Sequence, residues 1–289
     1  MKDSIETAIL LIHCPDRQGI VAAVTTYLSQ YHGNILDLEQ HVDHEDQRFF
    51  MRVKWSLKGF GLSRSALETD FEEKIARPFE MNWQLHYSTK VTRMAVFVSK
   101  MSHCLYDILQ RHSTKEWMVD IPLIISNHPN LKTIAERFGI PFHVFPITKE
   151  NKHIQEQRIL TLLQLHKIDF VVLARYMQIV TDQFISHYPN RIINIHHSFL
   201  PAFVGARPYH QAYDRGVKII GASSHYVTAK LDAGPIIAQD VEHISHNDGV
   251  ADLVRKGRDL EKLVLARAIW HHLHHNILPY RNRTMVFNQ

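Results

Sequence analysis

Cysteine is scarce in this sequence, which has only Cys14 and Cys104 among its 289 residues. The two lie far apart along the chain and show neither metal-ligand nor redox spacing, so no disulfide framework is implied. Few and unpaired cysteines are typical of proteins from a reducing compartment. We therefore expect a cytoplasmic protein.

Long apolar runs are also missing. No segment approaches the roughly 20 apolar residues that span a bilayer, and residues 1–6 carry acidic side chains where a signal peptide carries its basic end. Neither a Gly-x-Gly-x-x-Gly sequence nor a P-loop sequence occurs. We expect no membrane contact and no cofactor.

Neither sign of charge dominates. The 33 Lys and Arg residues against 29 Asp and Glu residues leave a net charge of +4, which is dispersed along the chain. The lack of a basic arm or stripe argues against nucleic acid as a partner. A small anionic substrate and no charged partner at all fit this balance equally well.

Residues 1–88 show the pattern of a small βαββαβ unit. Short apolar or alternating runs are separated by turn residues, and two segments repeat apolar residues at helical spacing. The predicted strands are residues 8–13, 35–42, 49–55 and 83–87, and the predicted helices are 20–28 and 63–75. We predict a ferredoxin-like first domain.

From Thr92 onward, after a polar stretch at residues 88–93, apolar strands alternate with helices. The strand candidates are residues 94–98, 121–126, 142–145, 170–174, 192–195 and 219–226, and a long helix is expected over 252–274. Continuous apolar strands indicate burial on both faces, as in a parallel sheet covered by helices. We therefore predict an α/β protein whose residues 89–289 form a Rossmann-like, mostly parallel second domain.

The most informative stretch is Ile193 to Pro201, placed where a central strand ends. In open α/β sheets, reactive groups gather at the carboxyl ends of the strands. Asn194 and His196 alternate along the strand and therefore share a face. With 22 histidines in the chain, however, a histidine in a loop is also expected by chance.

Asp232 is the third candidate. The pair Gly234-Pro235 forces a turn just after it, which would hold the carboxylate in a loop facing the same cleft, although an Asp before such a pair is commonly just a turn former. An amide, an imidazole and a carboxylate together suit attack on a carbonyl without a covalent intermediate.

The order of these motifs resembles the folate-dependent formyltransferase family. The resemblance covers about Thr92 to the C-terminus and implies that Asn194, His196 and Asp232 are catalytic. It is carried by Asn194-Ile195-His196, Ser198-x-Leu200-Pro201, Gly221-x-Ser223-x-His225 and Leu231-Asp232-x-Gly234-Pro235-Ile236.

In that family the pterin part of the folate lies against the segment after the fourth strand, which here is Leu173 to Val180. The resemblance implies folate contacts from Met177, Gln178, Ile179, Val180, Ser223 and His225. The alternative is that the apolar members of this set simply pack a strand end, and both interpretations can hold together.

The formyl acceptor is a separate question, because one fold serves several acceptors. The first turn of the second domain, Val98 to Cys104, lacks the glycine and asparagine with which glycinamide ribonucleotide transformylases cradle a phosphate. The chain also ends soon after its last helix, which leaves no room for the extra β domain of methionyl-tRNA formyltransferases.

The first domain resembles an ACT domain, with Pro15 to Ile20 between its first strand and helix. Its pairing with a formyltransferase-like domain, and the run Gly205 to Ala212, resemble the formyltetrahydrofolate deformylases. Water is then the acceptor, and the implied reaction is hydrolysis of 10-formyltetrahydrofolate to tetrahydrofolate and formate, which would supply formate for purine synthesis and balance one-carbon pools. An amine acceptor, or a catalytically idle assembly protein responsive to amino acids, are the alternatives.

For the ACT-like domain, the resemblance implies a methionine or glycine effector bound between paired domains of a homodimer or homotetramer. The expected contacts are Asp16, Gly19, Ile20, Asn34 and Ile35. The alternative is that this domain only pairs subunits.

The histidine-rich run 271–275 would place His271 and His275 on one helix face, but no further ligand accompanies them, so we predict a solvated helix end and no metal site.

Overall fold

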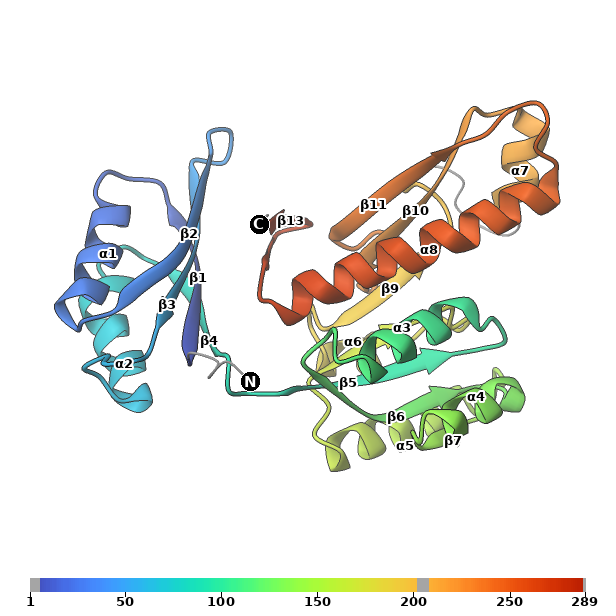
Figure 1. Cartoon of the computed structure of the whole chain (residues 1–289), viewed down its shortest axis with the longest axis horizontal. Coiled ribbons are helices and arrows are strands. Elements are labelled where there is room, and N and C mark those ends of the chain that lie inside the picture. The colour runs from blue at the N-terminus through green and yellow to red at the C-terminus, as the bar shows by residue number, and fades with distance from the viewer. Residues whose placement is uncertain (1–5, 202–207, 288–289) are drawn as a thin grey trace. The chain divides into compact units, whose positions relative to one another are not determined.

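The computed structural model describes residues 6–201 and 208–287, and the chain divides into two compact units (Figure 1). The first comprises residues 6–91, His275–Leu278 and 285–287; the second comprises Thr92–His274 and Pro279–Thr284. The C-terminal residues are therefore shared between the units, whereas the sequence assigned everything after residue 88 to one domain.

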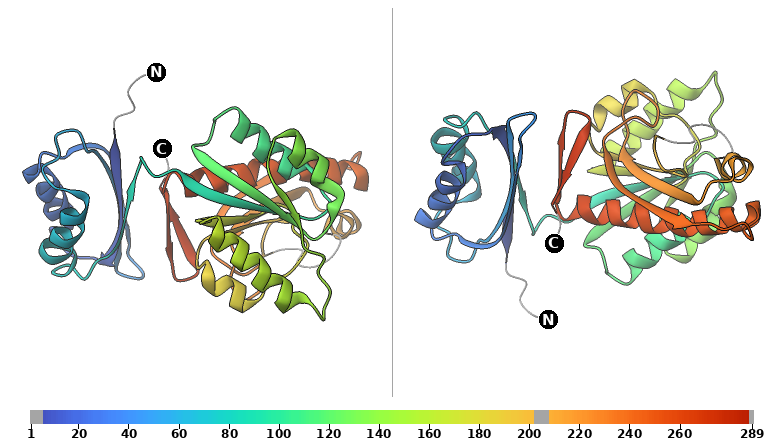
Figure 2. Two further views of the ribbon diagram at one scale, coloured as in Figure 1. Left: turned by 90° about the horizontal axis from the view of Figure 1, so that it is seen from below. Right: turned by 90° about the horizontal axis from the view of Figure 1, so that it is seen from above.

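The first unit is a four-stranded antiparallel sheet with its helices on one face (Figure 2). Its elements are β1 (Thr7–Pro15), α1 (Ile20–Gln30), β2 (Asn34–Asp43), β3 (Arg48–Ser56), α2 (Arg64–Phe71), the π-helical turn η1 (Glu72–Ala76) and β4 (Asn82–Tyr87). The strand order β2-β3-β1-β4 makes this the predicted ferredoxin-like βαββαβ fold.

Strand β3 shows why this unit folds as it does. Alternate apolar residues, among them Met51, Val53 and Trp55, pack into the core with Val24 and Leu28 of α1. The opposite face of β3 is covered as well, because Arg52 is 1% exposed, pairs with Asp37 and donates to the carbonyl oxygen of His275, 3.1 Å away.

The second unit alternates strands and helices. Its elements are β5 (Thr92–Val98), α3 (His103–Ser113), β6 (Val119–Ser126), η2 (Pro129–Leu131), α4 (Lys132–Arg137), β7 (Phe142–Val144), α5 (Lys152–Leu165), β8 (Phe170–Leu173), α6 (Asp182–His187), β9 (Ile192–His196), α7 (Pro208–Arg215), β10 (Ile219–Tyr226), β11 (Ile236–His243) and α8 (Val250–Leu273). A two-stranded ribbon of β12 (Ile277–Tyr280) and β13 (Arg283–Val286) follows α8.

Seven strands form one sheet in the order β11-β10-β9-β8-β5-β6-β7. The five from β9 to β7 are parallel, as predicted. β10 runs antiparallel to both of its neighbours, β9 and β11, so the sheet is mostly parallel as predicted. Strands β11, β12 and β13 were not predicted. A pattern of buried apolar residues does not indicate the direction of a strand. The connection between β10 and β11 is too short for the crossover that parallel strands need, so these two strands form an antiparallel hairpin.

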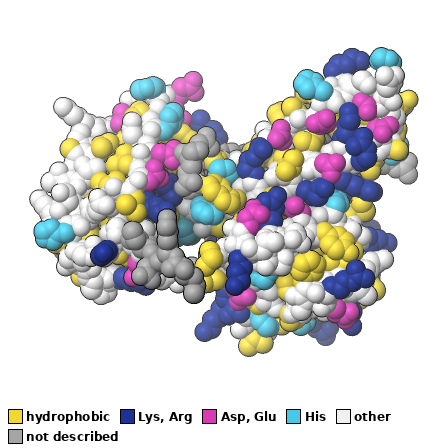
Figure 3. Space-filling view, in the orientation of Figure 1, with side chains coloured by type: hydrophobic (Ala, Val, Ile, Leu, Met, Phe, Trp, Pro, Cys, Tyr) yellow, Lys and Arg dark blue, Asp and Glu magenta, His cyan; other side chains and the backbone are white. Residues whose placement is uncertain are grey.

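Helices cover both faces of this sheet (Figure 2). α5 and α6 pack over β5, β6 and β8 in one apolar core, whereas α3 and α8 lie against each other on the other face. No helix in residues 6–201 or 208–287 is long and apolar enough to cross a membrane. On the face of the second unit seen in Figure 3, basic and acidic side chains are interspersed.

Candidate active site

Three neighbouring strands of the second unit converge on one site. β9 pairs in parallel with β8 and antiparallel with β10, so Asn194 lies between Leu173 and His225. His196 ends β9 two residues later. Because alternate residues face the same side of a sheet, Asn194 and His196 are directed to one cavity, which both line.

Asp232 reaches this cavity from the loop between β10 and β11. Its backbone φ of 51° lies in the left-handed region, which costs a non-glycine residue about 1–2 kcal/mol. At Gly234 a Cβ atom would lie 1.8 Å from the carbonyl oxygen of Tyr226. Only glycine fits there, so the Gly234-Pro235 turn fixes the loop that carries the carboxylate.

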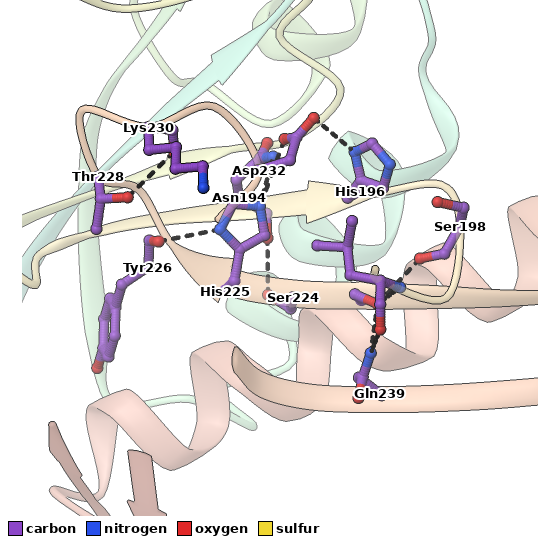
Figure 4. Close-up of polar contacts among 12 residues, drawn as sticks. Asn194, His196, Ser198, Ser224, His225, Tyr226, Thr228, Lys230, Asp232 and Gln239 are labelled. Carbon is purple, nitrogen blue, oxygen red and sulfur yellow. Dashed lines mark hydrogen bonds and ion pairs between the residues drawn. The ribbon is translucent and has the colours of Figure 1, made fainter. Parts of the chain in front are cut away.

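The Asp232 carboxylate lies between two imidazoles (Figure 4). Its Oδ2 atom is 3.3 Å from Nδ1 of His196, and its Oδ1 atom is 3.7 Å from Nε2 of His225. The Nε2 atom of His196 is buried and has no hydrogen-bond partner among the described residues. This nitrogen therefore keeps its hydrogen-bonding capacity.

His225, expected to contact folate, lines the cavity and also orients the Asn194 amide. Its Nδ1 atom lies 3.0 Å from the carbonyl oxygen of Tyr226, so Nδ1 carries the proton and donates. In that tautomer Nε2 accepts a hydrogen bond, and it lies 3.2 Å from Nδ2 of Asn194. Asn194 keeps a second N–H for the cavity.

Negative charge in this cluster is held by Asp232. The contact with His196 lowers the pKa of Asp232 well below the ordinary range, despite the opposing effect of partial burial. The carboxylate therefore stays ionised at physiological pH. The neighbouring His197 has its pKa lowered to about 4 by burial and by the positive charge of Arg175, so its imidazole is neutral.

The cavity has a volume of about 360 Å³. The catalytic candidates line one part of its wall, and the segment 175–180, which follows β8, lines another. Met177 and Ile179 are 59% and 60% exposed although both are apolar. Exposed apolar side chains beside convergent polar groups suit a flat ring such as a pterin.

The segment 175–180 is held in place by buried polar groups. The backbone N–H of Met177 donates to Oγ of Ser99 at 2.9 Å, and Ser99 donates to Oδ1 of Asn127 at 2.6 Å. At the other end, the N–H of Thr181 donates to the buried carboxylate of Glu156 at 3.1 Å. Its backbone groups are therefore preorganised for a ligand.

Ser223 does not reach the cavity, although the sequence placed it among the folate contacts. It is fully buried, and its hydroxyl donates to the carbonyl oxygen of Ser198 while accepting from the N–H of Leu200 and from Gln239. Ser223 thus anchors the loop after His196. Of the run Gly205 to Ala212, residues 205–207 lie outside the described residues.

The five expected effector contacts lie in the first unit. Gly19, with φ of 93°, immediately precedes α1. Because glycine has no side chain, it cannot accept a hydrogen bond from the first N–H groups of that helix. Ile20 is 2% exposed and belongs to the core, so only its backbone is available. Asn34 is exposed, Ile35 packs partly against the core, and the N–H of Asp16 donates to the carbonyl oxygen of Gln47 at 2.9 Å.

A polar cluster is buried beneath the site. His103, Cys104 and Glu261 offer three ligand atoms within 4.8 Å of one another. Both oxygens of Glu261 already accept hydrogen bonds, from His103 at 2.7 Å and from Tyr209 at 2.8 Å, and Arg175 lies 3.5 Å away. Burial and the charge of Glu261 raise the pKa of Cys104, so its thiol stays protonated. We interpret the cluster as an ion-pair network.

The histidine run after residue 270 differs from the expectation. α8 ends at Leu273, and His275 has φ of 51° and belongs to the first unit, so His271 and His275 do not share a helix face. The run is not a solvated helix end, because its members are partly buried and Nδ1 of His272 lies 2.8 Å from the Tyr226 hydroxyl.

Comparison with known proteins decides the family. Residues 92–269 match the formyl transferase family model, and residues 8–55 match the ACT domain model. The formyltetrahydrofolate deformylase of Synechocystis sp. is 56% identical over 281 residues, which cover 97% of this chain and 98% of that protein. This chain belongs to the formyltetrahydrofolate deformylase family.

Solved structures agree with this membership. A formyltetrahydrofolate deformylase from Pseudomonas syringae pv. tomato is 43% identical with a TM-score of 0.96, covering 99% of this chain and 96% of that one. A glycinamide ribonucleotide transformylase from Symbiobacterium toebii is 29% identical with a TM-score of 0.66, covering 71% of this chain and 98% of that one. Deformylase-family members therefore share a fold with transferases, so the choice of acceptor depends on individual residues.

Proposed function

We propose that this chain hydrolyses 10-formyltetrahydrofolate to tetrahydrofolate and formate. The observation that carries the proposal is the meeting of Asn194, His196 and Asp232 in one cavity. Membership of the deformylase family supports water as the acceptor. The released formate and tetrahydrofolate would serve purine synthesis and the balance of one-carbon pools.

In the proposed reaction, a water molecule attacks the formyl carbon. Asp232 accepts a proton from this water, because its Oδ1 atom, 3.7 Å from His225, is too far for a hydrogen bond and retains acceptor capacity. The resulting oxyanion receives hydrogen bonds from the free N–H of Asn194 and from His196. The carbon–nitrogen bond then breaks, His196 passes a proton to the departing nitrogen, and formate and tetrahydrofolate leave.

The pterin ring would occupy the part of the cavity lined by residues 177–180. Met177 and Ile179 offer apolar contact to its face, while backbone groups from Gln178 to Val180 read its polar edge. The buried anchors Ser99 and Glu156 support this assignment, because they fix the backbone before the ligand arrives.

An assay without any acceptor tests the proposed reaction. Purified protein with 10-formyltetrahydrofolate alone is expected to release one formate for each tetrahydrofolate formed. Formate is measured with a coupled dehydrogenase and tetrahydrofolate by absorbance. Strict dependence on an added amine would instead support the transferase alternative, and no reaction with any amine would support the idle assembly protein.

For the first unit, we propose that the Asp16–Ile20 loop and the turn at Asn34 and Ile35 bind methionine or glycine, between paired ACT domains of a homo-oligomer. Uncapped N–H groups at the start of α1 suit the amino acid's carboxylate. Titration calorimetry with each amino acid is expected to give saturable heat for one of them. Absence of both heat and rate change with either would leave only a role in assembly.

A further inference from the structure

Arg175 occupies an unusual place beside the reaction centre. It follows Leu173 by two residues as His196 follows Asn194, and Leu173 and Asn194 are partners in the parallel pair β8–β9. Arg175 and His196 therefore come from neighbouring strands at the same end of the sheet, and both line the cavity. The φ of Arg175 is 62°, a conformation that L-residues adopt at a cost.

The guanidinium of Arg175 is not saturated with acceptors. Its Nε and Nη1 atoms are buried, and neither has a hydrogen-bond partner within residues 6–201 and 208–287. The nearest carboxylate, Glu261, lies 3.5 Å from Nε and already accepts from His103 and Tyr209. A guanidinium carries five N–H donors, and buried donors left unpaired are costly.

In the part of the chain that the structure describes, no group accepts a hydrogen bond from Nε or Nη1 of Arg175. His197, which also lines the cavity, is neutral and lies next to His196, with 5.3 Å between the ring centroids. Cys104 keeps its proton, and the Tyr209 hydroxyl donates to Glu261. Besides its ion pair with Glu261, Arg175 therefore keeps donor capacity for a small anion beside His196 in the cavity wall.

We propose that Arg175 forms a binding subsite for a small monocarboxylate, which is the formate product. This inference rests on the proposed function, because hydrolysis generates a carboxylate beside His196. The Nη1 end of the guanidinium, which together with Nη2 forms a fork, matches the two oxygens of a carboxylate, and such charge-assisted pairs are the strong ones. Arg175 would hold formate after the carbon–nitrogen bond has broken, so that formate inhibits the enzyme as a product.

A folate molecule carries carboxylates of its own, in its glutamate tail, and these are the second possible source of the missing acceptor. The formate site and a tail site make different predictions. If Arg175 bound the tail, replacing it would raise the KM for 10-formyltetrahydrofolate but not for the 10-formyl pteroate analogue that lacks glutamate. For a formate site, the ratio of the two KM values stays unchanged.

The test compares Arg175→Met and Arg175→Lys with wild type and with Arg191→Met, which removes an exposed arginine outside the cavity. Formate binding is measured by calorimetry with tetrahydrofolate present, and by inhibition at constant ionic strength against chloride. Arg175→Met is expected to weaken formate binding about tenfold or more. Arg175→Lys, which keeps the charge but loses the fork, should weaken it less, and Arg191→Met should not change it.

Three results overturn the subsite. The first is that wild type binds formate no more strongly than chloride. The second is that Arg175→Met and wild type bind formate with equal affinity. The third is that replacing Arg175 raises the KM of the glutamylated substrate selectively. If Arg175→Met does not fold, Arg175→Lys decides by the same criteria. The calorimetric titration measures formate binding without turnover, so it tests the subsite alone. The acceptor-free assay tests the proposed hydrolysis, and the two proposals can therefore fail separately.

Discussion

Asp232→Asn is expected to lower kcat for formate release by on the order of a hundredfold to ten-thousandfold. The amide keeps the shape of the side chain, but it can neither take a proton from water nor stabilise positive charge on His196, which lies 3.3 Å away. KM should change little, because the cavity wall that would bind the pterin is untouched. Steady-state kinetics with 10-formyltetrahydrofolate gives both values.

Asp240→Asn provides the matched control for Asp232→Asn. Asp240 lies on β11, in the same hairpin, and pairs with Arg267 away from the cavity. This variant should retain the wild-type kcat. Near wild-type turnover in Asp232→Asn, with the protein folded by circular dichroism, would show that the carboxylate is not the catalytic group.

The sequence was most informative where local pattern determines geometry. Asn194 and His196 alternate at the end of a buried strand, so their common direction follows from strand pleating alone. The loop position of Asp232 follows from the glycine and proline after it. That these residues meet in one cavity depends on the pairing of β9 with β10, which no local pattern specifies.

The sequence analysis missed Glu261, Arg175 and His197, because their roles also depend on how distant segments pack together. Glu261 lies in the middle of α8, where a glutamate ordinarily faces solvent, and only the packing of α3 and α7 against that helix buries it. Arg175 follows a strand in a left-handed conformation that nothing in its neighbours announces. The sequence does hold one feature that points to this cluster, which is a glycine in the middle of a long helix. At this position, Gly257, a Cβ atom would lie 2.1 Å from the Tyr209 hydroxyl, so the glycine lets Tyr209 approach α8.

The architecture shows the same division. Periods of two and 3.6 residues located most strands and helices, because these periods reflect burial of one face. They did not reveal that β10 and β11 run antiparallel, or that residues 275–278 belong with the first unit. Both features depend on contacts between segments distant in the chain, such as that of Arg52 with the His275 carbonyl.

Glu261→Ala is expected to destabilise the second unit by about 3–5 kcal/mol, because it leaves the Arg175 charge buried without its carboxylate and empties the acceptor sites for His103 and Tyr209. Burial alone would raise the pKa of Glu261, but His103 and Arg175 outweigh it, so the pKa is lowered in the folded protein. The contribution is therefore present at neutral pH and lost as pH falls below the ordinary range of a glutamate. Urea unfolding at neutral and acidic pH measures both effects.

Asp259→Ala tests whether any acidic residue of α8 has this effect. Asp259 is exposed and pairs with the neighbouring Lys262, so its replacement should change the free energy of unfolding by less than about 0.5 kcal/mol. Glu261→Gln should fall between the two variants, because the amide oxygen can still accept from Tyr209 while the charge is gone. Equal stability of Glu261→Ala and Asp259→Ala at neutral pH would mean that the buried cluster does not hold Arg175 in place. The position of Arg175 in the formate site would then depend on the segment 175–180 alone.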